Sequence, residues 1–296
     1  MNIIFISGRG YYSHDNSRGL NYEYLHIVPA LSDLGNDIYH LDYLSTQDVT
    51  TALEQAVERV HPQLIIYNPF ENEMDMDRFA QLAPVKMLLL SDDDFRRDYG
   101  LSLAPRADYV LTNQPDGALA YGSKYIAFQW GCYPRLYQPT RSRPIDCLFI
   151  GQAYGERPAY IDALRRAQIT VTVRGLLWQE GVAHDVAAML MAAKMSVNFN
   201  KSSRGNVMQM KARNFEIPAS GAVALLEYTP RLEEYFEDGK EVLFWRTTDE
   251  LIEKARWVMT HPAEATALAN AGKERAYNEH SYGTRFKSIF EKAGLQ

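Results

Sequence analysis

The chain has 296 residues, of which 46% are hydrophobic and 23% are charged, and its formal net charge is −6. This length predicts two domains, and this composition excludes a disordered protein. The two cysteines, Cys132 and Cys147, are too few for a disulfide framework, and no apolar run approaches the roughly 20 residues that cross a bilayer. We therefore expect a cytoplasmic protein without a membrane span.

The first half of the sequence alternates strand and helix patterns. Short apolar runs predict strands at Ile3–Ile6, Asp37–Tyr43, Leu64–Tyr67, Val85–Leu90, Tyr109–Thr112 and Tyr125–Phe128. Helical spacing of apolar residues predicts helices at Tyr22–Leu34, Thr51–Val60 and Asp75–Leu82. Strands that alternate with helices imply a parallel sheet covered on both faces.

The pattern restarts after a polar segment, Gln138–Pro144, which we interpret as a linker. Strands are predicted at Asp146–Ile150, Ile169–Val173, Ser196–Phe199, Ala222–Glu227 and Glu241–Phe244. Helices are predicted at Pro158–Ala167, His184–Ala193, Lys211–Pro218, Asp249–Thr260, Pro262–Asn278 and Tyr282–Lys292. The chain thus predicts two α/β domains, 1–140 and 141–296, and a ligand site in the cleft between them.

Charge differs between the two halves. Residues 1–140 hold 10 Lys and Arg against 18 Asp and Glu, whereas residues 141–296 hold 21 against 19. The second half therefore suits an anion such as a phosphate, and the first half would repel a polyanion.

The turn after the first strand carries Gly8 and Gly10, which allow a ligand to approach the backbone. The Gly-x-Gly-x-x-Gly spacing of a dinucleotide fold is incomplete, because Ser13 holds the third position. The same loop carries His14 and Asp15, so we expect it to line a cleft, the alternative being a flexible loop.

Three carboxylates, Asp92, Asp93 and Asp94, follow the predicted strand Val85–Leu90. They favour a helix cap, because aspartate suits the first turn of a helix. A role toward an acceptor and a metal site, for which carboxylate oxygens are suitable ligands, are the alternatives.

Two segments of the second half suit a diphosphate. At Gly151, a strand turns into a helix that begins near Arg157, and free N–H groups at such a start bind anions. The polar loop that begins near Asn200 leads to Lys211, Arg213 and Glu216. Arg213 and Glu216 are three residues apart and can form a surface ion pair, but the density of polar side chains favours a diphosphate and ribose site.

Several motifs of the second half, together with some of the first, resemble those of a known family. Lys211-x-Arg213-x-Phe215-Glu216-Ile217-Pro218-Ala219-Ser220-Gly221, Leu225-Leu226-Glu227-Tyr228 and Glu279-His280-Ser281-Tyr282 resemble the C-terminal domain of group-one glycosyltransferases. The spore-maturation (CgeB-like) group is the most similar branch. Asp92-Asp93-Asp94, Ala107–Asn113 and Gly131-Cys132-Tyr133-Pro134 are similar to the first half of that group.

The resemblance implies a GT-B fold, with two Rossmann-like domains whose parallel sheets face a cleft and with final helices that pack back toward the first domain. It implies that the second domain holds a nucleotide-diphosphate sugar, for which a UDP-sugar is expected, and that no metal or other cofactor is needed. Glu216 matches the glutamate that holds the donor ribose, and Gly151, Arg157, Lys211 and Arg213 match diphosphate-binding positions. Asn200, Gly8 and Gly10 complete the predicted donor-binding set.

One position departs from the family. Retaining members carry a Glu-x7-Glu pair, and Met208 stands where the first glutamate is expected. If the enzyme retains configuration, as the resemblance implies, the leaving phosphate can accept the acceptor's proton. If it inverts, a base is required, and Asp92, Asp93, His14 and Asp15 are the candidates.

The resulting hypothesis is a glycosyltransferase that moves a sugar to an unidentified acceptor, which could be a small molecule, a glycan or a protein. A nucleotide-sugar epimerase or phosphorylase on the same fold, and a non-catalytic nucleotide-sugar-binding protein, are the alternatives. The acidic first half argues against nucleic acid as a partner.

Overall fold

A computed structural model describes residues 1–10, 19–71, 73–91, 93–138, 142–179, 181, 185–202 and 207–295. The chain divides into two compact units, of which the first comprises Met1–Gln129 together with Tyr282–Gln296 and the second Trp130–Ser281. The predicted boundary lay at residue 140. Among the described residues, no helix is both long and apolar enough to cross a membrane.

The first unit is built on a parallel six-stranded sheet with the order β2-β1-β3-β4-β5-β6. Its strands are β1 (Asn2–Ser7), β2 (Asp37–Asp42), β3 (Leu64–Tyr67), β4 (Val85–Leu90), β5 (Tyr109–Thr112) and β6 (Tyr125–Ala127). Its helices are α1 (Tyr22–Asp33), α2 (Val49–Val60), α3 (Met76–Gln81), α4 (Arg97–Leu103), α5 (Gly117–Tyr121) and α11 (Tyr282–Lys292). Every strand predicted in this half is present.

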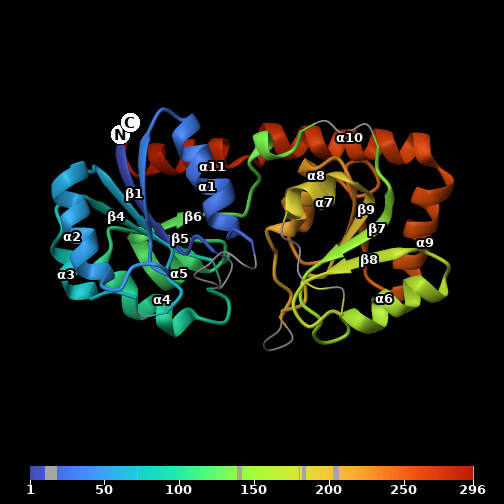
Figure 1. Cartoon of the computed structure of the whole chain (residues 1–296), viewed down its shortest axis with the longest axis horizontal. Coiled ribbons are helices and arrows are strands. Elements are labelled where there is room, and N and C mark those ends of the chain that lie inside the picture. The colour runs from blue at the N-terminus through green and yellow to red at the C-terminus, as the bar shows by residue number, and fades with distance from the viewer. Residues whose placement is uncertain are drawn as a thin grey trace. The chain divides into compact units, whose positions relative to one another are not determined.

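The last helix of the chain belongs to this first unit. Helix α11 packs beside α1, and in Figure 1 the red end of the chain accordingly lies next to the blue beginning. Its buried side chains are Tyr282, Phe286, Ile289 and Phe290, and the Tyr282 hydroxyl lies 3.2 Å from that of Tyr22 on α1.

The second unit has a parallel five-stranded sheet with the order β11-β10-β9-β7-β8. Its strands are β7 (Ile145–Ile150), β8 (Val171–Arg174), β9 (Ala193–Asn198), β10 (Val223–Glu227) and β11 (Leu243–Trp245). Its helices are α6 (Arg157–Arg166), α7 (Val186–Met191), α8 (Arg213–Ala219), α9 (Thr248–Thr260) and α10 (Pro262–Glu279). The predicted start of α7 at His184 lies outside the described residues.

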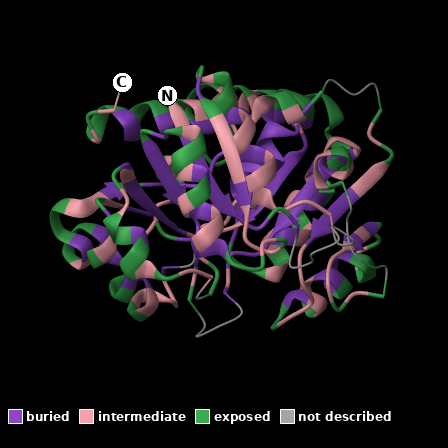
Figure 2. Cartoon of the chain, turned by 60° about the vertical axis from the view of Figure 1, so that its left-hand side comes forward, coloured by how far each residue is buried: buried purple, intermediate pink, exposed green. Residues whose placement is uncertain are grey.

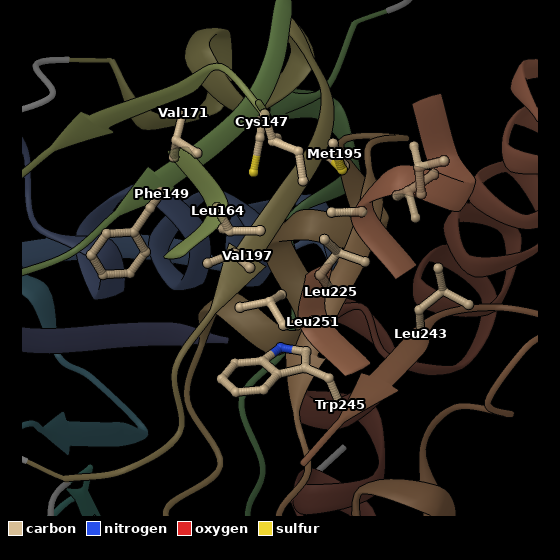
Figure 3. Packing of buried hydrophobic residues seen from close by; sticks show 14 of the residues in the cluster. Cys147, Phe149, Leu164, Val171, Met195, Val197, Leu225, Leu243, Trp245 and Leu251 are labelled. Atoms are coloured by element: carbon tan, nitrogen blue, oxygen red, sulfur yellow. The ribbon is translucent and has the colours of Figure 1, made fainter. Parts of the chain in front are cut away.

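Alternation along the strands gives the second sheet an apolar face. Phe149, Val197 and Leu225 point to the face that Leu164 of α6 and Leu251 of α9 cover, and Figure 3 shows these side chains interleaved. Successive strand residues point to opposite faces, so Ser196 and Asn198 point the other way. Figure 2 shows the consequence in both sheets, where buried strands are covered by helices whose outer surfaces are exposed.

Candidate functional site

Two glycines bring the strand ends of the second sheet close together. A Cβ atom on Gly175, which has a φ of +145°, would lie 2.0 Å from the carbonyl oxygen of Gly151. The Gly151 N–H donates to Arg174 O at 2.9 Å, and the Trp178 indole N–H donates to Gly151 O at 2.8 Å. The turn after β7 is therefore held against the turn after β8 by close backbone approach, which only glycine permits.

Arg157 holds this turn from the first position of α6. Its side chain is buried, and its guanidinium donates to Gln152 O at 3.1 Å, to Phe199 O at 3.3 Å and to the Tyr154 hydroxyl. The guanidinium carbon lies 3.7 Å from the centre of the Tyr154 ring, a cation–π distance. Arg157 therefore positions the loops after β7 and β9 and places a positive charge beneath them.

Lys211 reaches the same tyrosine from the segment before α8. Its ammonium lies 3.0 Å from the Tyr154 hydroxyl and 2.9 Å from the carbonyl oxygen of Lys201. Tyr154 thus contacts both cations, and its hydroxyl also donates to Lys201 O at 3.2 Å. Two cationic side chains that are far apart in the sequence are gathered around one phenol.

A buried amide network supports the loop after β9. Asn200 is fully buried, its Nδ2 donates to Glu227 O at 2.6 Å, and its Oδ1 accepts from Asn198 Nδ2 at 2.8 Å. Asn198 also donates to Asn214 of α8. Glu227, at the end of β10, accepts the backbone N–H groups of Asn200 at 2.6 Å and Lys201 at 3.1 Å through Oε2. This network fixes the loop from both sides, because buried polar groups are costly unless they are paired.

Arg213 and Glu216 pair on α8. Arg213 Nη1 lies 2.5 Å from Glu216 Oε2, and Glu216 is only 3% exposed. Burial, followed by the charge of Glu216, raises the pKa of Tyr137 well above its ordinary value. The ion pair that the sequence predicts as an alternative is therefore present, but it is largely buried. A carboxylate in such a place can also accept hydrogen bonds from hydroxyl groups of a ligand.

A cavity of about 270 Å³ opens beside these loops. Its polar lining includes Glu156, Arg157, Lys201 and Glu227, and its apolar lining includes Tyr160 and Phe199. Lys201 Nζ forms an exposed ion pair with Glu156 at 2.7 Å. Met208 lies opposite Lys201 in an antiparallel bridge, so the residue that departs from the family borders this loop.

The predicted donor-binding residues fall in two places. Gly151, Arg157, Asn200, Lys211, Arg213 and Glu216 all belong to the second unit, at or near its strand ends. Gly8 and Gly10 belong to the first unit and line a cavity of about 80 Å³ there. The contacts within each unit do not test whether these two glycines contact the donor, so that part of the donor-binding set stays a prediction.

Asp93 is the predicted catalytic candidate that the structure describes. Its carboxylate accepts from the Tyr121 hydroxyl at 2.5 Å and the Thr112 hydroxyl at 3.0 Å, and it lies 3.1 Å from Nε of Arg97. These contacts join β5, α4 and α5, and they favour a role in holding the elements together. His14, Asp15 and Asp92 lie outside the described residues, and the base role of all four stays a prediction.

Sequence reasoning did not select Tyr154, Lys201 and Glu227 as site residues. One signal was available for Glu227, because it ends a predicted strand and the ends of parallel strands meet at one edge of a sheet. No local pattern identifies Tyr154, because its contacts with Arg157 and Lys211 arise only when distant segments fold together.

Comparisons with known proteins agree with this architecture. Residues 157–291 match the family described as glycosyl transferase-like. HepE of Anabaena, solved in complex with UDP, has 12% identity and a TM-score of 0.64, with 99% of this chain and 100% of that chain covered. No curated protein sequence matches the chain.

Two further solved structures share the fold. Sucrose-phosphate synthase of Thermosynechococcus elongatus has 12% identity and a TM-score of 0.66, with 99% of both chains covered. A glycosyltransferase of Rickettsia africae has 10% identity and a TM-score of 0.66, with 98% of this chain and 97% of that chain covered. The GT-B fold is thus confirmed, and the match of residues 157–291 to the glycosyl transferase-like family agrees with the predicted enzyme class.

Proposed function

We propose that the protein transfers a sugar from a nucleotide-diphosphate sugar, with UDP-sugar as the donor, to an acceptor hydroxyl. The observation that carries the proposal is the group of cationic side chains at the strand ends of the second unit, where Lys211 and Arg157 meet at Tyr154. The UDP complex of the structurally similar HepE supports the choice of nucleotide. The similarity to the CgeB-like group remains part of this proposal.

The proposed chemistry relies on cationic side chains that stabilise negative charge on the leaving group, and it requires no metal or cofactor. As the bond between the sugar C1 and the phosphate oxygen breaks, negative charge builds on the β-phosphate. We propose that Lys211 and Arg157 stabilise that charge, directly or through the loops that they contact, and one such donor is typically worth ~3 kcal/mol. Glu216, buried on α8, is proposed to accept the ribose hydroxyls.

We propose that the configuration at C1 is retained. The acceptor oxygen then bonds to C1 while its proton passes to the departing phosphate oxygen, so no protein base is needed. Cytoplasmic location is proposed on the ground that the two cysteines of the chain form no disulfide.

The test is the melting temperature with and without UDP. UDP is expected to raise it by several degrees, and Lys211→Ala and Glu216→Ala are expected to remove most of the increase. Lys240→Ala is the matched control, because Lys240 is exposed and pairs only locally with Glu237 in the contacts described. Absence of stabilisation by UDP would contradict the proposal.

A non-catalytic binding protein is the second candidate, and Met208 favours it. The methionine borders the loop at Lys201 but cannot accept a hydrogen bond from a sugar hydroxyl as a carboxylate does. Mass spectrometry of products from a panel of UDP-sugars and acceptors separates the two functions. UDP binding without any transfer or donor hydrolysis would favour the binding protein.

A further inference from the structure

Tyr154 lies in the turn after β7, and its backbone is held from both sides. Its N–H donates to Gln152 O at 3.2 Å, and its carbonyl oxygen accepts the N–H of Arg157 at 3.4 Å. The preceding residue, Ala153, donates to Leu176 O at 3.2 Å and so ties this turn to the loop after β8. The side chain of Tyr154 is half-buried and lines the cavity of about 270 Å³. The fold therefore brings this phenol to one defined place among the loops.

The phenol hydroxyl takes part in three hydrogen bonds, which matches its capacity of one donor and two acceptor lone pairs. It donates to Lys201 O at 3.2 Å, and it accepts from the Lys211 ammonium at 3.0 Å and from the Arg157 guanidinium. Two nitrogens that both bond to one oxygen are at most about 6 Å apart. Like charges at such a distance repel each other, so the oxygen between them favours this close spacing.

The other contacts of the two cations lead to different groups. Lys211 bonds to Lys201 O at 2.9 Å, whereas Arg157 bonds to Gln152 O at 3.1 Å and to Phe199 O at 3.3 Å. The phenol oxygen, in contrast, is a partner that the two side chains share. Removal of the hydroxyl alone should therefore leave both cations in the loops but make their separation less defined.

We propose that Tyr154 is a positioning residue of the donor site, which sets the separation of Lys211 and Arg157 so that both can act on one diphosphate. Two phosphate groups joined through a single oxygen carry their negative charges close together, so the cations that stabilise them must also be close together. The inference rests on the proposed transferase function and adds to it a residue that acts through the two cations.

Titration of Tyr154→Phe with UDP and with uridine, followed by saturation-transfer NMR, tests this role. The substitution removes the hydroxyl and keeps the ring, whose centre lies 3.7 Å from the guanidinium carbon of Arg157. The affinity for UDP is expected to fall about tenfold, because hydrogen bonds to two charged groups are lost. The affinity for uridine should stay unchanged, because uridine has no phosphate. A general loosening of the loops would weaken the binding of both ligands.

Tyr277→Phe is the matched control. Tyr277 is a half-buried tyrosine of the same unit, on α10, and its hydroxyl donates to Pro134 O and to Tyr137 O at 3.3 Å. Loss of this hydroxyl should change neither affinity.

A second measurement asks whether Tyr154 acts through Lys211. Tyr154→Phe is combined with Lys211→Ala, and the UDP affinities of the two single variants and the double variant are compared with that of the unmodified protein. Residues that act together give effects that do not add. Tyr154→Phe is therefore expected to weaken UDP binding by a smaller factor when Lys211 is already absent.

The outcomes separate this inference from the proposed function. If Tyr154→Phe binds UDP as tightly as the unmodified protein, or loses affinity for UDP and uridine by the same factor, the hydroxyl does not position the cations and the inference is wrong. The same factor of loss with and without Lys211 would also overturn it. If UDP does not bind to the unmodified protein, the proposed transferase function fails instead.

Discussion

His40, in β2, shows how one partly buried side chain can make the stability of the first unit depend on pH. Its Nε2 lies 3.0 Å from Ser7 Oγ, and its ring packs near those of Phe5 and Tyr24. Burial lowers its pKa from 6.5 to about 4; the charge of Asp42 and the contact with Ser7 oppose this shift, and Arg9 adds to it. The folded protein therefore keeps this imidazole neutral over a range in which the unfolded chain is protonated.

We expect the free energy of unfolding to fall as the pH is lowered from 6.5 toward 4. In that range the unfolded state binds a proton that the folded state does not, so protonation favours unfolding. The expected loss is about 2 kcal/mol, which allows for partial exposure of the ring. Urea unfolding between pH 7 and 4.5 measures it.

His40→Asn should reduce this pH dependence, whereas His61→Asn, at an exposed position, should leave it unchanged. The same slope in His40→Asn as in the unmodified protein would show that other groups are responsible. The comparison uses slopes, so any constant loss of stability in the variant does not affect it.

At the scale of elements, Arg143 joins two helix ends in the second unit. Its Nη1 donates to Met191 O at 2.9 Å and to Ala193 O at 2.8 Å, and its Nη2 donates to Ser220 O at 2.8 Å. Met191 ends α7 and Ser220 caps the end of α8, where helices carry partial negative charge and unpaired carbonyl oxygens, and Ala193 begins β9.

Arg143→Met is expected to destabilise the protein by about 2–4 kcal/mol, because it leaves several buried carbonyl groups without a donor. Chemical denaturation followed by tryptophan fluorescence measures the loss. Arg231→Met provides the control, since the exposed pair of Arg231 with Glu234 should contribute less than about 1 kcal/mol. Equal effects of the two substitutions would show that the helix ends do not depend on Arg143.

Strands made of continuous apolar runs could be predicted from the sequence, and very short helices could not. The strand at Leu64–Tyr67 is present as predicted, because a continuous apolar run between turns has few alternatives. Helix α5 was not predicted, because its five residues are too few to show a helical period. The strand predicted at Ile169–Val173 begins two residues later, at Val171.

The candidate site was predictable to a similar degree. Residues that follow strands, such as Gly151 and Asn200, can be placed at one sheet edge from topology alone. The partners of a long side chain cannot, since Lys211 meets Tyr154 across 57 residues of sequence. Gly8 lies in the first unit, as the predicted domain 1–140 implies, but a glycine signature does not tell whether it contacts the donor.

At the scale of the whole molecule, the first unit is completed by residues from the far end of the chain. Phe286 of α11 is fully buried, and α11 packs against α1 and β6. The charge division changes accordingly, because α11 contributes Arg285, Lys287 and Lys292 to the acidic unit.

Phe286→Ala is expected to destabilise the first unit by about 3–5 kcal/mol, because it leaves a cavity in a closely packed core. Hydrogen exchange followed by mass spectrometry should show faster exchange in α1 and β6, with α10 little changed. Leu268→Ala, in the core of the second unit, should give the opposite distribution. Faster exchange in α10 alone after Phe286→Ala would contradict the division into units.

The contribution of α11 to the first unit bears on the order in which the protein matures during synthesis. The ribosome makes residues 1–129 first, yet their sheet lacks its final helix until residues 282–292 emerge. The second unit is continuous in sequence, so it can fold while translation proceeds. Domains commonly fold in the order in which they are made. Here the unit that begins the chain should be the last to reach its native state, with the surface of α1 that receives α11 open to chaperones in the interval.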